Sequence, residues 1–72
     1  MVEKLKNYIE NRYKDAEKNA KTWRDIENWR AQAYGALMFC LENDYVDYDE
    51  VTEYWETMWN KFWELDDKIS RE

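Results

Sequence analysis

Residues 48–70 read YDEVTEYWETMWNKFWELDDKIS, and this stretch decides the fold because its apolar side chains recur with the period of an α-helix. One face of that helix carries Val51, Met58, Phe62, Leu65 and Ile69. Trp55, Trp59 and Trp63 recur at intervals of four and form an indole stripe beside this face. The segment therefore predicts an amphipathic helix whose Trp stripe is core, interface or both. We expect Trp55 at the edge of the core.

The start of this helix is marked by the polar residues that precede it. Asp47 and Glu50, three positions apart, form an acidic version of a capping box. We therefore expect the helix to begin at Tyr48.

The middle of the chain is apolar on every side when drawn as a helix, most densely in the run Ala31–Leu41. A helix of this kind is usually buried all round. Gly35 costs about 1 kcal/mol relative to Ala inside a helix, so we expect another helix to cross closely there. The run is about half the length that spans a bilayer, and we predict no membrane association.

The first part of the chain keeps helical spacing with a less apolar face. A break is expected near Asn19–Thr22, because Thr22 and Asp25 form a second capping box. The apolar repeat nevertheless continues through this point, so a fused helix of about 40 residues is the alternative.

We predict an all-α fold, a small three-helix bundle in which residues 1–72 form a single helical domain with helices at about 2–19, 22–42 and 48–70. The alternative is a long helical hairpin that dimerises. A homodimer is expected in either case.

Composition limits the function classes. The chain has 72 residues, one Cys and no His, so neither a disulfide framework nor the usual zinc ligands are available. Cys40 lies in an apolar run, where thiols are generally inert, and Ser70 lies near the C-terminus. We therefore expect no enzyme, and no catalytic residue, metal or cofactor. The charged start MVEKLK is unlike a signal peptide, which predicts a cytoplasmic protein.

Charge is distributed unevenly around a net value of −6. Residues 1–30 hold eight basic and six acidic side chains, a balance of +2, whereas residues 31–72 hold three and eleven, a balance of −8. No basic residue lies between Arg30 and Lys61. Such a field repels nucleic acid and attracts basic protein surfaces. The basic residues of the first part are interleaved with acidic ones, so direct nucleic-acid binding is not expected.

The acidic and aromatic side chains that follow Glu42 are the candidate partner-binding surface. Carboxylates spaced along a helix can occupy arginine sites that otherwise hold phosphates. The predicted contact residues are Asp44, Tyr45, Asp47, Asp49, Glu50, Glu53, Glu56, Trp59 and Trp63.

The stretch RAQAYGALMF, residues 30–39, in a short acidic chain rich in Tyr and Trp, looks like small helical accessory proteins of bacteriophages and mobile elements, including anti-CRISPR inhibitors. The resemblance implies a non-enzymatic protein-binding module that docks on a basic, nucleic-acid-handling protein of a bacterial host cell, such as a CRISPR nuclease. The alternative function is a structural homo-oligomer closed by a Trp-lined helical interface.

Overall fold

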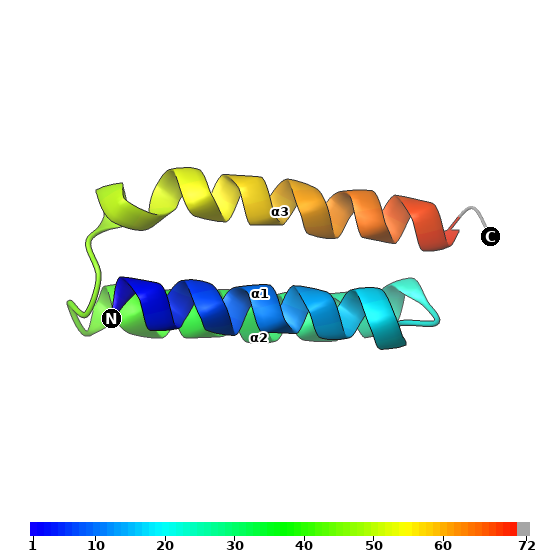
Figure 1. Ribbon diagram of the computed structural model, residues 1–72, viewed down its shortest axis with the longest axis horizontal. Helices are drawn as coiled ribbons and strands as arrows, with labels where there is room; N and C mark the ends of the chain where they lie inside the picture. Colours follow the sequence, from blue (N-terminus) through cyan, green and yellow to red (C-terminus); the bar gives the residue numbers. More distant parts are fainter. Residues whose placement is uncertain (71–72) are drawn as a thin grey trace.

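Three helices follow one another along the chain: α1 (Val2–Asn19), α2 (Trp23–Glu42) and α3 (Tyr48–Ser70). The computed structural model describes residues 1–70. In Figure 1, α1 and α3 run in the same direction, α2 runs in the opposite direction behind α1, and the N-terminus lies at the same end as the α2–α3 loop. Each helix packs against the other two, and the molecule measures 40 × 17 × 17 Å. The predicted three-helix bundle is confirmed.

The break between α1 and α2 is held by the Asp25 carboxylate. The backbone N–H groups of Lys21 and Thr22 donate to Asp25 Oδ2 at 3.0 and 3.3 Å, and these two bonds lower the pKa of Asp25. Ala20 and Thr22 have extended backbone conformations. The chain therefore leaves the helix and re-enters it, and no fused helix forms.

The α2–α3 loop is short and makes its own hydrogen bonds. The backbone N–H of Tyr45 donates to the Cys40 carbonyl oxygen at 2.9 Å, while Asp44 takes a left-handed backbone conformation with φ 58°. The Asp47 N–H donates to Glu50 Oε1 at 3.0 Å. This bond joins the Glu50 side chain, in the first turn of α3, to the loop. Helix α3 begins at Tyr48, the residue after Asp47.

The core runs along the bundle axis between the three helices. Phe62 is fully buried, and the Tyr13 ring meets it edge-on with the ring centroids 5.4 Å apart. The buried side chains are Leu5, Ile9, Ala16, Ile26, Ala33, Leu37, Cys40, Val46, Val51, Met58, Phe62 and Leu65. The predicted core face of α3 is buried as expected, except that Ile69 is only partly covered.

Two expectations about α2 are wrong. Tyr34 and Phe39 are 46% and 57% exposed, so this helix is not buried all round. Its two neighbours cover one broad side and leave the opposite side in solvent, where these two aromatic rings lie among polar side chains such as Asn28 and Gln32. Gly35 is exposed, and a Cβ added there would meet nothing within 4 Å, so no helix crosses closely at this position. In the described part of the chain, no helix is both long enough and apolar enough to cross a membrane.

Candidate protein-binding groove

The indole stripe of α3 lies partly in the core and partly at the surface. Trp55 is half-buried against the core, whereas Trp59 and Trp63 are 36% and 50% exposed. The three rings form a continuous row, with centroids 5.7 Å apart for Trp55–Trp59 and 6.5 Å apart for Trp59–Trp63. The row thus leads from the edge of the core to the surface.

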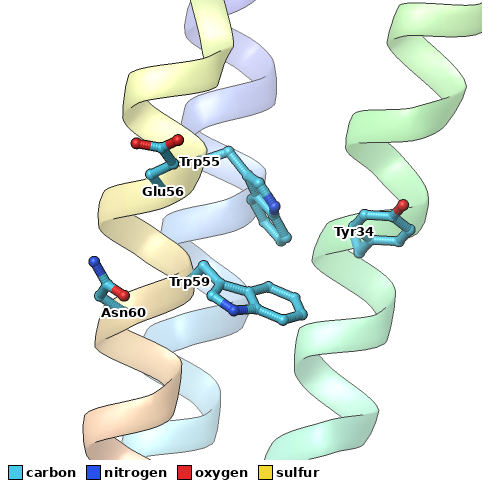
Figure 2. Close-up of a pocket in the computed structure, with 5 residues that line it drawn as sticks. All are labelled: Tyr34, Trp55, Glu56, Trp59 and Asn60. Atoms are coloured by element: carbon cyan, nitrogen blue, oxygen red, sulfur yellow. The ribbon is translucent and has the colours of Figure 1, made fainter.

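The facing helix α2 contributes Tyr34 and Arg30 to the same region. The Tyr34 ring lies 5.8 Å from the Trp55 ring, and Figure 2 shows Trp55 and Trp59 pointing from α3 into the space on the side of Tyr34. We call this region the α2–α3 groove. Its residues are Glu27, Arg30, Ala31, Tyr34, Trp55, Glu56, Trp59, Asn60 and Trp63.

Arg30 joins the two helices through its guanidinium group. Its Cζ atom lies 4.9 Å from the ring centroid of Trp59 and 5.1 Å from that of Trp63, both within cation–π range. Arg30 Nη2 pairs with Glu27 Oε1 at 2.9 Å, and the Arg30 side chain is only 12% exposed. Arg30 Nη1 is buried without a hydrogen-bond partner. Apart from its ion pair with Glu27, Arg30 is therefore held mainly by its contact with the two indole rings.

The groove contains two hollows that share Tyr34 and Trp59. One has a volume of about 390 Å³ and is also lined by Trp55, Glu56 and Asn60. The other, of about 360 Å³, is also lined by Glu27, Arg30 and Ala31. The two hollows differ in charge, because the second contains an arginine and the first contains a carboxylate with no basic residue in its lining.

An acidic side borders the groove along α3. Asp49, Glu53 and Glu56 are exposed and share one side of the helix, in the same angular sector as Trp63 but in the turns that precede it. Within residues 1–70, the salt bridges are Arg12–Asp15 and Arg30–Glu27, so none of these three carboxylates is neutralised by an ion pair. We call Asp49, Glu53 and Glu56 the acidic side of α3.

The remaining predicted contact residues lie elsewhere. Asp44, Tyr45 and Asp47 belong to the loop at the end of the bundle, where the Tyr45 ring packs 5.9 Å from that of Phe39. This end is about 22 Å from Trp63 along the helix axis. Glu50 lies about 100° around α3 from Asp49, and its carboxylate accepts the Asp47 N–H.

The structure therefore places Glu56, Trp59 and Trp63 at the groove, whereas Glu53 and Asp49 lie about one and two turns nearer the start of α3 than Glu56. Sequence reasoning missed the residues that α2 supplies, chiefly Arg30 and Tyr34. Their spacing of four, continuing the line of the buried Ile26, was the available signal.

The groove suits the binding of flat or cationic groups, because its walls are aromatic faces and its rim is acidic. Among the described residues, no group of three or more His, Cys, Asp or Glu side chains is arranged to hold a metal ion.

Comparison of the chain with protein-family models, with curated proteins and with solved structures finds no match.

Proposed function

We propose that this protein is a non-enzymatic binding module that places the α2–α3 groove and the acidic side of α3 against a basic protein surface. The observation that carries the proposal is the unpaired acidic side next to exposed indoles. Aromatic side chains supply most of the anchoring energy in protein interfaces, while rim charges select the partner and speed its approach.

In its sharper form, the partner is a nucleic-acid-handling protein of a bacterial host, such as a CRISPR nuclease. Arginine sites that bind phosphate also bind carboxylates, and Asp49, Glu53 and Glu56 follow one side of a helix with exposed side chains. Occupying such sites would block the nucleic acid, as anti-CRISPR inhibitors do. The sequence resemblance at residues 30–39 supports the same reading.

The test is a charge reversal that leaves the fold intact. Glu53→Lys with Glu56→Lys removes the centre of the acidic side, while Asp49 stays because its charge also favours the first turn of α3. Glu17→Lys with Glu42→Lys, both exposed and outside the groove and the first turn of any helix, gives the same net charge as a control. Each protein is used to capture partners from a bacterial lysate at low and high salt, and the captured proteins are identified by mass spectrometry.

We expect the natural chain and the control to retain the same basic protein at low salt and to release it at high salt. The variant with Glu53→Lys and Glu56→Lys should not retain this protein at either salt concentration. Inhibition of nucleic-acid binding by the purified partner then tests the sharper form. Equal capture by the variant with Glu53→Lys and Glu56→Lys and by the control would exclude the acidic side of α3 as the contact surface.

A second candidate function is a structural homo-oligomer, favoured by the number of large apolar side chains left at the surface. Trp23, Tyr34, Phe39 and Trp63 are each 46% or more exposed. Light scattering separates the two candidates. A stable dimer in which Trp59 and Trp63 are protected from a fluorescence quencher favours assembly, and a monomer with quenchable indoles favours a separate partner.

A further inference from the structure

We propose that the 390 Å³ hollow of the groove is an anchor pocket for an arginine side chain of the partner. Its lining is Tyr34, Trp55, Glu56, Trp59 and Asn60. This inference rests on the proposed binding function and names the chemical group by which the partner is held.

The pocket is built from ring faces at the junction of two helices. Tyr34 and Trp55 meet at 46°, and Trp55 and Trp59 meet at 53°, so these rings are tilted and not stacked. Figure 2 shows both indoles reaching from α3 toward the space between the helices, with Tyr34 on the opposite side. Tilted rings leave their electron-rich faces partly open, and a cation placed among them is attracted by more than one ring.

The protein already shows which group these indoles accept. Arg30 lies over Trp59 and Trp63 in the adjoining hollow, at 4.9 and 5.1 Å. Trp59 lines both hollows, but only the adjoining one holds a basic side chain from this chain. The anchor pocket has the same kind of aromatic wall without its cation.

The chemistry of the pocket favours a guanidinium group over an ammonium group. Glu56 and Asn60 also line the pocket, and Figure 2 shows their side chains on the side of α3 that faces away from Tyr34, so their oxygen acceptors lie at its outer edge and not among the rings. A guanidinium has five N–H donors for such acceptors, is flat and is less strongly hydrated than an ammonium group, so it enters an aromatic pocket at lower cost than lysine.

A second copy of the chain fits this pocket less well. In a symmetric dimer closed through the groove, the acidic sides of the two copies lie close to each other, because the same surface is used twice. Residues 31–60 of each copy contain no basic residue, and the Arg30 of the groove is already paired with Glu27 and covered by two indoles. Like charges at an interface oppose association, so a basic partner is the favoured occupant.

The test uses a hexaarginine peptide and a hexalysine peptide, which carry equal charge. Binding is followed by NMR through the indole N–H signals and by titration calorimetry. We expect hexaarginine to bind about fivefold more tightly than hexalysine and to shift the Trp55 and Trp59 signals, but not that of the distant Trp23.

The variants separate the pocket from general attraction between charges. Tyr34→Leu removes one ring at an exposed position and should bring hexaarginine down to the affinity of hexalysine, whereas Tyr34→Phe keeps the ring and the difference. Tyr45→Leu, an equally exposed tyrosine in the α2–α3 loop, should leave the difference unchanged.

Equal affinity for the two peptides, or a preference that survives Tyr34→Leu, overturns the anchor pocket and leaves the acidic side as a binding surface. Binding of neither peptide overturns the anchor pocket and the proposed function together. A dimer in light scattering with unshifted Trp55 and Trp59 signals overturns the arginine pocket and assigns the groove to a second copy.

Discussion

Tyr54 connects α3 to α1 through a partly buried hydrogen bond. Its hydroxyl donates to the Lys6 carbonyl oxygen at 3.0 Å, and the Lys6 ammonium lies 5.2 Å from the centre of the Tyr54 ring. Burial of the phenol, followed by the nearby charge of Glu10, raises the pKa of Tyr54 well above its ordinary value of 10.0. This residue therefore prefers to stay neutral in the folded protein.

We expect Tyr54→Phe to lower the free energy of unfolding by about 1 kcal/mol at pH 7, because the hydrogen bond to α1 is lost while the ring stays. A phenol with a raised pKa stabilises the fold below pH 10.0 and loses that contribution as the pH rises through the raised value. The deficit of Tyr54→Phe should therefore shrink above pH 10.0.

Urea unfolding followed by circular dichroism over this pH range measures both effects. The exposed Tyr45→Phe serves as the control and should behave like the natural chain throughout. A constant difference between Tyr54→Phe and the natural chain across the alkaline range would contradict the raised pKa.

At the scale of the element, α2 contains the single glycine of the chain in a position where nothing requires it. Gly35 is helical and exposed, and its φ is not positive. An added Cβ meets no atom within 4 Å. The usual reasons for glycine, a left-handed backbone or a close approach, are both missing here.

We therefore expect Gly35→Ala to raise the free energy of unfolding by about 0.5–1 kcal/mol, because alanine loses less backbone entropy when it becomes helical. Ala31→Gly, at an exposed position in the same helix, should lower it by a similar amount. Thermal unfolding of the two variants beside the natural chain measures both changes. A Gly35→Ala protein that is less stable than the natural chain would show that a neighbour does approach α2 at this point.

The helices could be predicted from the sequence because the signals that set them are local. Asp25 binds the N–H groups of Lys21 and Thr22 within one turn, and Glu50 binds that of Asp47 in the same way. The exposed sides of α2 could not be predicted, since burial depends on where two distant helices lie. Composition alone gave no sign that Tyr34 and Phe39 face solvent.

The candidate site also has a part that the sequence predicts and a part that it does not. The periodicity of α3 places Trp59 and Trp63 beside the acidic side, which is information within one helix. The spacing of Ile26, Arg30 and Tyr34 places them along one side of α2, but that this side meets α3 and completes the groove depends on how the two helices pack.

For the molecule as a whole, the dominant feature is excess negative charge on one part of the chain. The net charge is −6, and the ion pairs among the described residues join neighbours three positions apart within a helix. Screening by salt therefore weakens few ion pairs between helices. It also reduces the repulsion among the carboxylates, which opposes the folded state. Salt should act on the fold and on a complex with a basic partner in opposite directions.

We predict that the melting temperature rises as sodium chloride increases from about 0.01 M to about 0.15 M, where the screening length falls from about 30 Å to about 8 Å. Glu53→Gln with Glu56→Gln keeps the shape of the acidic side and removes two negative charges, so this variant should be more stable than the natural chain at low salt and respond less to added salt. A calorimetric scan at several salt concentrations measures both. If the variant is less stable at low salt, these carboxylates stabilise the fold, and their presence needs no partner to explain it. If it is more stable but loses the basic partner, stability has been given up on this side of α3 for binding.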